Sequence, residues 1–174
     1  ALDWGRAILR EDANRSSYDA LSEPWAQPLA ETRLDQLGET SVLASQASIA
    51  GSMEDAQSRL NLRNLIDKGE IVESELEALR QLCTLLQVTQ QTADLIAQRM
   101  QLALPSSVVD DGGRAMDSVG VGSTIRPIPL MLPQDLLSIP GISAEAAQRL
   151  APYIVVLDER TPVNVNTARP EVIA

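Results

Sequence analysis

Acidic side chains stand next to one another at four places in the sequence, and paired carboxylates are groups that acid–base catalysis or metal binding would use. Acid–base catalysis needs two carboxylates that converge in one cleft, and adjacency along the chain does not establish such convergence. We therefore interpret the pairs as solvated faces or helix caps, and we predict that the protein is not an enzyme. The pairs are Glu11–Asp12, Glu54–Asp55, Asp110–Asp111 and Asp158–Glu159.

Three aspartates, Asp110, Asp111 and Asp117, share one glycine-rich segment and are candidate metal ligands. A hard cation such as calcium is bound by several oxygens of this kind, although the spacing is not that of an EF-hand loop. The sequence contains no zinc-site spacing, phosphate-binding glycine loop or nucleotide fingerprint. Calcium is therefore the one possible cofactor, and a calcium-regulated binding domain is kept as an alternative function.

Residues 137–143, which read LSIPGIS, resemble the turn of a helix-hairpin-helix element. In nucleic-acid-binding versions, the amides of this turn and of the next helix hold a backbone phosphate, with bases nearby. Here Ser143 replaces the second glycine of the usual motif, and one base, Arg149, stands among the acids Asp135 and Glu145. We predict a structural hairpin, and a nucleic-acid module is kept as the less favoured alternative.

Composition excludes several other kinds of chemistry. The 174 residues include no histidine, which excludes a Ser-His-Asp triad, a Cys-His pair and a histidine metal site. The single cysteine, Cys83, cannot form an intramolecular disulfide and is interpreted as a small core residue. Acidic residues outnumber basic ones by 24 to 14, and the net charge of -10 argues against a general nucleic-acid-binding protein.

The first 15 residues are predicted to form an amphipathic helix that begins upstream, in a longer protein. Its apolar half would pack on its own domain or contact partner helices. Residues 16–46 are predicted to be irregular, and residues 49–62 to form a short meander of strands. The apolar half of the helix carries Leu2, Trp4, Ile8, Leu9 and Ala13.

Residues 62–104 are predicted to be helical, because leucines recur there at helical spacing. Ser74 and Glu77 would form a capping box, and Thr89 would cap a second helix. Residues 105–129 are rich in glycine and proline and are interpreted as a long break.

The next section, residues 130–151, is predicted to be a helical hairpin, with Pro133 at the first helical position and Ser143 as a cap. A short apolar strand is expected over 153–157, and alternating valines predict a further strand over 163–166. Four asparagines flank these elements and are expected to lock two chain crossings between a sheet and a helical lobe, because their side chains can satisfy backbone groups. They are Asn61, Asn64, Asn164 and Asn166.

Several stretches in the same order resemble the soluble domain of protein K of the general secretion pathway, the large minor pseudopilin family of type II secretion systems. Two substitutions depart from the family pattern, with Ser58 and Leu60 in place of glycine and phenylalanine. The matching stretches are residues 7–12 (AILRED), 21–26 (LSEPWA), 54–62 (EDAQSRLNL), 150–154 (LAPYI) and 161–168 (TPVNVNTA).

The resemblance implies an α+β pseudopilin fold, in which an N-terminal helix packs on an antiparallel sheet that is interrupted by a large inserted α-helical domain. The domain boundaries expected are 1–60 for the helix and first strands, 61–160 for the inserted domain with its helix-hairpin-helix-like element, and 161–174 for the return to the sheet. The implied protein is periplasmic and is anchored in the inner membrane by a helix upstream of this sequence.

The resemblance also implies a non-enzymatic subunit at the tip of the pseudopilus, which starts or caps the fibre for protein export. Its partners would be the family's proteins I and J and the major pseudopilin, with no nucleic acid. We expect partner contact on the apolar half of the first helix, at Trp4, Ile8 and Leu9, with burial in the domain itself as the alternative. Some relatives bind calcium, but their acidic "DWLD" and "GAExxxY" segments are missing here, so no ligand residue is carried over.

Overall fold

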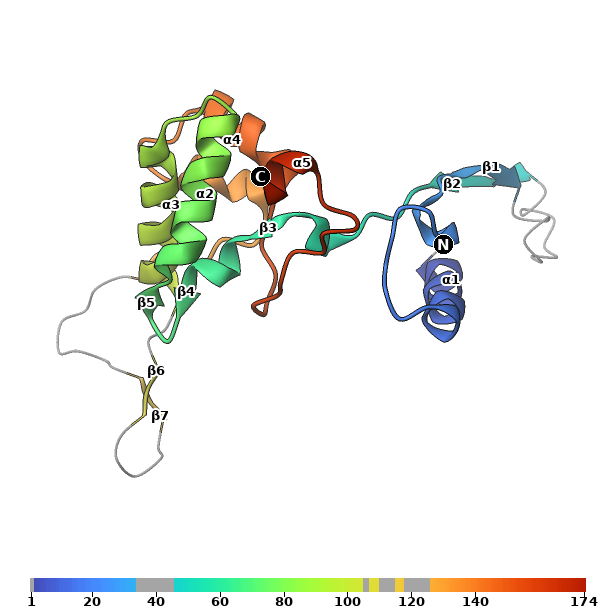
Figure 1. The fold of residues 1–174 in the computed structure, drawn as a ribbon, viewed down its shortest axis with the longest axis horizontal. Helices are drawn as coiled ribbons and strands as arrows, with labels where there is room; N and C mark the ends of the chain where they lie inside the picture. Colours follow the sequence, from blue (N-terminus) through green and yellow to red (C-terminus); the bar gives the residue numbers. More distant parts are fainter. Residues whose placement is uncertain (1, 34–45, 105–106, 110–114, 118–125) are drawn as a thin grey trace. The chain divides into compact units, whose positions relative to one another are not determined.

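Two units make up the chain in the computed structural model, an N-terminal unit over Ala1–Ala56 and a C-terminal unit over Gln57–Ala174. The structure describes residues 2–33, 46–104, 107–109, 115–117 and 126–174. Both units contain helices and strands (Figure 1). Among the described residues, no helix is both long enough and apolar enough to cross a bilayer.

The N-terminal unit begins with helix α1 (Leu2–Arg15), as the amphipathic pattern predicted. A 3₁₀ helix (Pro24–Ala26) follows, and it places the indole of Trp25 in the interior with 3% exposure. The irregular region predicted over 16–46 is wrong in part, because strand β1 (Leu29–Arg33) forms there and pairs antiparallel with β2 (Ser48–Gly51).

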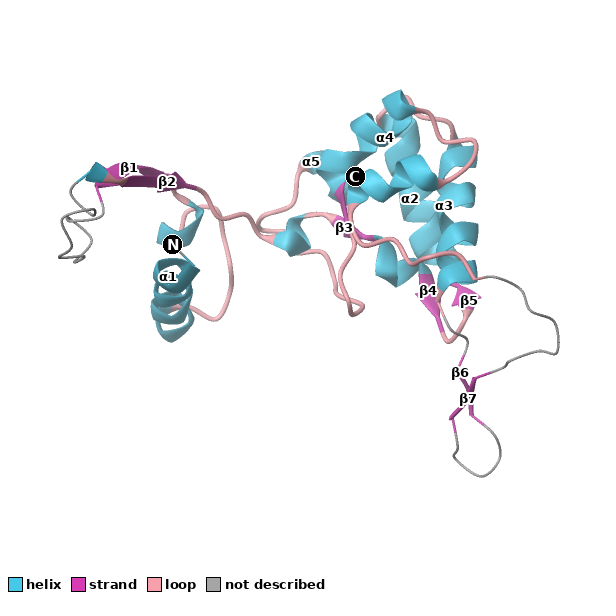
Figure 2. Ribbon diagram, turned by 180° about the vertical axis from the view of Figure 1, so that it is seen from behind, coloured by secondary structure: helices cyan, strands magenta, loops and turns pink. Residues whose placement is uncertain are grey.

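Helices dominate the C-terminal unit (Figure 2). Helices α2 and α3 form a hairpin whose facing apolar stripes build the core, with α4 and two 3₁₀ helices packed around them. The helices are α2 (Glu73–Leu85), α3 (Gln90–Ala103), α4 (Ala144–Leu150) and α5 (Pro170–Ile173), and the 3₁₀ helices are Ala56–Ser58, Leu62–Leu65, Pro133–Ser138 and Ala151–Tyr153.

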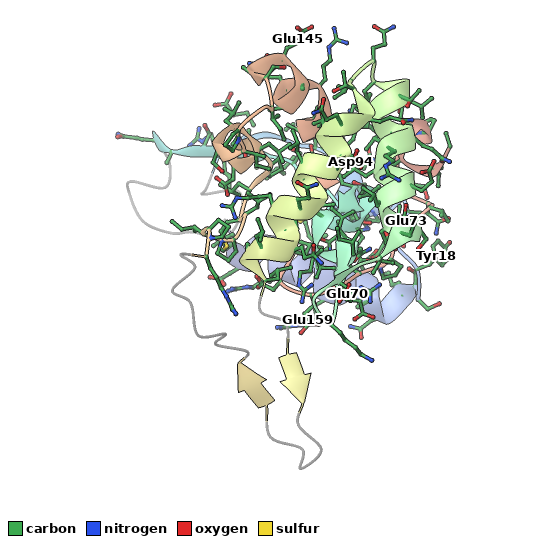
Figure 3. All side chains as sticks on the ribbon, turned by 90° about the vertical axis from the view of Figure 1, so that its left-hand side faces the viewer. Tyr18, Glu70, Glu73, Asp94, Glu145 and Glu159 are labelled. Atoms are coloured by element: carbon green, nitrogen blue, oxygen red, sulfur yellow. The ribbon has the colours of Figure 1, made fainter. Side chains whose placement is uncertain are left out.

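A charged cluster also joins the two long helices on their outer side. The Arg80 guanidinium on α2 donates from Nε and Nη2 to Asp94 Oδ1 on α3, at 3.0 and 2.7 Å. Its Nη1 donates to Glu73 Oε1 at 3.0 Å. Figure 3 labels Glu73 and Asp94 on the two neighbouring helices, and Arg80 ties them together.

The strands in the described part of the C-terminal unit are short and form three pairs. β3 (Leu60–Asn61) runs parallel to β8 (Ile154–Val155), with Leu60 opposite Ile154. The other two pairs are antiparallel hairpins, β4 (Ile66–Asp67) with β5 (Glu70–Ile71), and β6 (Ser107–Val109) with β7 (Ala115–Asp117).

Three local predictions for this unit are wrong. Residues 66–71 form a hairpin instead of continuing a helix. The capping box at Ser74 does not form, because α2 already begins at Glu73, and Val72 precedes it without a side-chain cap. The strand predicted over 163–166 is absent, because the Asn164 carbonyl starts a turn and accepts from the amides of Thr167 and Ala168.

Asn64 illustrates how the predicted asparagines act. Its Nδ2 donates to the carbonyl oxygen of Thr161 at 2.8 Å, and its Oδ1 accepts from the amide of Thr161 at 3.0 Å. The side chain therefore imitates a strand partner for a residue 97 positions away. Asn61 makes similar bonds to the same stretch, so the prediction that these side chains satisfy backbone groups is confirmed for Asn61 and Asn64. Their role at a crossing between a sheet and a helical lobe stays a prediction, because these bonds all lie within the C-terminal unit.

The hairpin predicted over 130–151 is confirmed, although its first helix is a 3₁₀ helix. Ser143 caps α4, because its Oγ accepts from the amide of Ala146 at 3.1 Å. Gly141 makes the turn with φ +94°, a conformation that side chains with a Cβ rarely adopt. A Cβ there would also lie 3.2 Å from Leu95 Cδ1.

Replacing Gly141 with alanine is expected to lower the free energy of unfolding of the C-terminal unit by about 1–2 kcal/mol, because of backbone strain and the tight contact with Leu95. Urea unfolding followed by far-UV circular dichroism measures the loss. Gly51→Ala is the control, because a Cβ at Gly51 meets nothing within 4 Å. Equal stability of Gly141→Ala and the wild type would contradict the expected strain.

Candidate partner interface

One side of α1 faces the β1–β2 hairpin across an open groove of about 330 Å³. We call it the helix–hairpin groove, and it lies entirely in the N-terminal unit. Because a helix turns by 100° per residue, positions 2, 5, 6 and 9 share one side of α1 and reach the groove together. Its main apolar lining is Leu2, Gly5 and Leu9 of α1 with Leu29, Ile49 and Met53 of the hairpin side.

Apolar side chains in this groove remain open to solvent. Leu2 is 79% exposed and Leu9 is 47% exposed. An ion pair between Arg6 and Asp3, at 3.2 Å, lies on the same helix at the groove's margin. An apolar hollow with a charged rim is the arrangement found in protein–protein interfaces.

Two of the three predicted interface residues have described side chains, and these two line different grooves. Leu9 lines the helix–hairpin groove, whereas half-buried Ile8 lines a second groove of about 300 Å³ together with Asp12 and Pro24. The side chain of Trp4 lies outside what the structure describes. The structure therefore places half-buried Ile8 in one groove and exposed Leu9 in the other, and partner contact at these residues stays a prediction.

The residues of the hairpin that complete the groove were missed in the sequence. Leu29 lies in the stretch 16–46, which the sequence predicts to be irregular. The half-buried positions of β1 are Leu29 and Thr32, which are three residues apart rather than two. A bulge between these two residues breaks the strict alternation that would reveal a strand.

The predicted calcium ligands Asp110 and Asp111 lie outside the described residues, and for Asp117 only the backbone, in β7, is described. Their proposed role stays a prediction. A different carboxylate cluster does lie within the described N-terminal unit. Oxygens of Asp12, Asp19 and Glu23 come within 4.8 Å of one another.

Two members of this cluster have opposite electrostatic environments. Burial raises the pKa of Asp12, and the charges of Glu23 and Asp19 raise it further, against a smaller opposing effect of Arg15. Hydrogen bonds from Ser16 Oγ, at 2.7 Å, and from the amide of Ala20, at 2.6 Å, hold the pKa of Glu23 below its ordinary value.

Trp25 adds a third donor to Glu23, because its Nε1 lies 3.1 Å from Glu23 Oε2. Of these three residues, only Asp12 stands in one of the adjacent carboxylate pairs of the sequence, next to Glu11. Asp19 and Glu23 follow in the loop, and only the fold brings them to the end of α1.

The helix-hairpin-helix-like element does not supply the clustered bases that phosphate binding needs. Its base, Arg149, is paired with Glu145 at 2.8 Å and also donates to the carbonyl oxygen of Leu86. Asp135 accepts from the amides of Met131 and Leu132, and these bonds lower its pKa. The charges of this hairpin therefore serve its own structure.

Comparison with known proteins agrees with the resemblance seen in the sequence. Type II secretion system protein K of Pseudomonas aeruginosa is 25% identical, and the alignment covers 97% of this chain but only 51% of that protein. The chain therefore spans about half the length of this relative.

A chain in the crystal structure of the GspK–GspI–GspJ complex from the enterotoxigenic Escherichia coli Type 2 Secretion System has a similar fold. The TM-score is 0.69 at 20% identity, and the match covers 98% of this chain and 61% of that one. The family model described as type II secretion system (T2SS), protein K, matches residues 58–159, more than half of the sequence. The chain therefore belongs to the type II secretion system protein K family.

Proposed function

We propose that this chain is part of a non-enzymatic minor pseudopilin that acts at the tip of a type II secretion pseudopilus. In this role it assembles with the family's proteins I and J and with the major pseudopilin, and it starts or caps the fibre for protein export. The observation that carries the proposal is the helix–hairpin groove in a member of this family, with Leu9 held 47% exposed at its edge. The similar chain solved with GspI and GspJ supports the choice of partners.

The same proposal extends to the architecture. On this proposal, helix α1 and the antiparallel β1–β2 pair would belong to the pseudopilin domain predicted over residues 1–60. The helical C-terminal unit would hold the insertion predicted over 61–160. The protein would work in the periplasm, anchored in the inner membrane by a helix upstream of α1.

Partner contact through α1 is testable with a charge at Leu9. Leu9→Glu is expected to weaken the complex with proteins I and J of the same organism about 10- to 100-fold, because it would bury an unpaired charge in an apolar contact. Co-purification followed by a binding titration measures the loss. Leu102→Glu is the matched control, because Leu102 lies on α3 and is 63% exposed.

Both variants place glutamate on a solvent-exposed helical position, so both are expected to fold. Circular dichroism and the melting temperature establish this before binding is measured. Unchanged assembly of Leu9→Glu, or an equal loss in Leu102→Glu, would remove the groove as the partner surface.

A further inference from the structure

The helix–hairpin groove contains a single charged side chain among its described lining residues. That side chain is Arg6, which reaches the groove from α1 and follows Gly5 in the sequence. The rest of the lining is apolar or uncharged. A segment that fills the groove therefore meets one fixed positive charge, because a guanidinium in a protein stays protonated.

This positive charge is opposite to the net charge of the unit around it. The N-terminal unit carries ten acidic and four basic side chains. The acidic excess lies outside the groove, since no aspartate or glutamate is among the described residues that line it. The groove is therefore complementary to a carboxylate of a partner rather than to a basic group.

Arg6 is available to a partner although it already has a contact. Its Nη1 lies 3.2 Å from Asp3 Oδ1, and the two side chains are 73% and 96% exposed. An ion pair so open to water contributes little free energy, because water and salt screen it. A carboxylate brought in by an apolar segment would meet the same guanidinium partly shielded from water, where the attraction is stronger. Exchange of Asp3 for that carboxylate is therefore favourable.

Gly5 leaves an open place in the wall of the groove beside this charge. Glycine within a helix lowers stability relative to alanine, so its presence in α1 calls for a reason. The packing of the chain itself gives none. Outside α1, the one described atom within 4 Å of a Cβ at Gly5 would be Met53 Sδ, at 3.6 Å, which is an ordinary van der Waals contact. The missing side chain instead lets an incoming backbone approach α1 closely.

We propose that the helix–hairpin groove is filled by an apolar stretch of a partner pseudopilin, the family's protein I or J, whose carboxylate pairs with Arg6 while its backbone passes over Gly5. The inference rests on the proposed function, because it takes the groove to be a partner surface, and it adds the chemistry that selects the partner. Leu2 and Leu9 supply apolar contact on either side of these two residues along α1. Arg6 would then select an acidic segment over a neutral or basic one.

Charge reversal at Arg6 tests the electrostatic part. Arg6→Glu is expected to weaken the complex with proteins I and J of the same organism about 10- to 100-fold, because glutamate repels the partner's carboxylate. Arg6→Gln is expected to weaken it less, because glutamine only fails to attract that group. Arg10→Glu is the matched control, since it makes the same charge change at an exposed position of α1 that does not line the groove. It is expected to change the affinity less than about threefold.

Ionic strength gives a readout that damage to the fold would not produce. The binding titration is repeated at about 50 and about 500 mM salt, and the affinity of the wild type is expected to fall as salt rises. This fall is expected to be smaller in Arg6→Gln, because the screened ion pair is gone. A salt dependence of Arg6→Gln equal to that of the wild type, or equal losses of affinity in Arg6→Glu and Arg10→Glu, would overturn the proposal.

Gly5→Ala is expected to have opposite effects on the chain and on the complex. It should raise the melting temperature of the N-terminal unit, followed by fluorescence of Trp4 and Trp25, by about 2–5 °C, because alanine favours the helix. It should weaken the complex about 5- to 10-fold, because the added methyl group lies where the partner's backbone would pass. Asn14→Ala, at an exposed position of α1 outside the groove, should also raise the melting temperature but leave binding unchanged. Equal or tighter binding of Gly5→Ala would overturn the close approach.

Leu9→Glu separates a failure of this inference from a failure of the proposed function. If Leu9→Glu weakens the complex while the Arg6 variants bind as the wild type does, the groove is a partner surface without a selecting charge, and this inference alone is wrong. If Leu9→Glu and the Arg6 variants all bind normally, the partner surface lies elsewhere and both are wrong.

Discussion

Replacing Asn61 with alanine is expected to lower the free energy of unfolding of the C-terminal unit by about 3–5 kcal/mol. Its side chain is 1% exposed and makes four hydrogen bonds. Nδ2 donates to the carbonyl oxygen of Glu159 and to Thr161 Oγ1, and Oδ1 accepts from the amides of Arg63 and Leu157, all at 2.8–3.1 Å. Alanine would leave these groups without partners in a largely closed site, which costs about 1–3 kcal/mol for each buried one.

Urea unfolding followed by far-UV circular dichroism measures this effect, because the C-terminal unit holds most of the described helix. Asn166→Ala is the matched control, because Asn166 is exposed and contributes its backbone amide to the Asn164 side chain. The control is expected to change the free energy of unfolding by less than about 0.5 kcal/mol. A loss below about 1 kcal/mol in Asn61→Ala would show that water replaces the lost bonds.

The chemistry of Asn61 was predictable from sequence, but its partners were not. A short amide side chain beside apolar residues must satisfy backbone groups, and this holds wherever the chain goes. That Leu157 and Glu159 are the partners depends on how the helices between Asn61 and these two residues pack. The separations of 96 and 98 residues lie far beyond any local pattern.

The predicted start of a helix was wrong where a long-range contact competed with a local capping signal. Ser74 followed by Glu77 is a good capping box, yet α2 begins one residue before Ser74. The amide of Val72 donates to the carbonyl oxygen of Leu65 at 2.8 Å, so the β4–β5 hairpin sets the start of the helix. At Ser143 the predicted cap is correct, because its Oγ accepts from the amide of Ala146.

The candidate interface was predictable only in its helical half. The helical periodicity placed Leu9 on the apolar side of α1. It also placed Ile8 on that side, because the apolar side covers about half of the helix. Two different segments divide that arc, because Leu29 and Met53 line a groove with Leu9, whereas Pro24 of the 3₁₀ helix lines a groove with Ile8. Pairing of β1 with β2 is a long-range event that the bulged, short strands conceal.

Cys83 is expected to react with a thiol reagent at least about 100-fold more slowly in the folded chain than in urea at pH 8. Burial raises the pKa of the Cys83 thiol to about 11, and its residue has 0% exposure. The reagent attacks only the thiolate, which is scarce at pH 8 when the pKa is this high. Since the chain has one cysteine, colour release by a disulfide reagent reports on this site alone.

The pH profile of this reaction distinguishes two routes to the thiol. Direct attack on the folded state would accelerate about tenfold per pH unit up to about pH 11. Attack after unfolding meets an ordinary thiol with a pKa of about 8.5, so the rate would level off above about pH 9. Complete burial of Cys83 favours the second route, and we expect the plateau.

Labelling after unfolding also links the prediction for Cys83 to the prediction for Asn61→Ala. If labelling requires unfolding of the C-terminal unit, its rate follows the population of the open state. A loss of about 3–5 kcal/mol in Asn61→Ala would then accelerate labelling of Cys83 by about two to three and a half powers of ten. Labelling that stays at the wild-type rate while the urea midpoint falls would mean that Cys83 is reached by a local opening. In that case the contacts of Asn61 and the packing around α2 belong to separate cooperative regions of the unit.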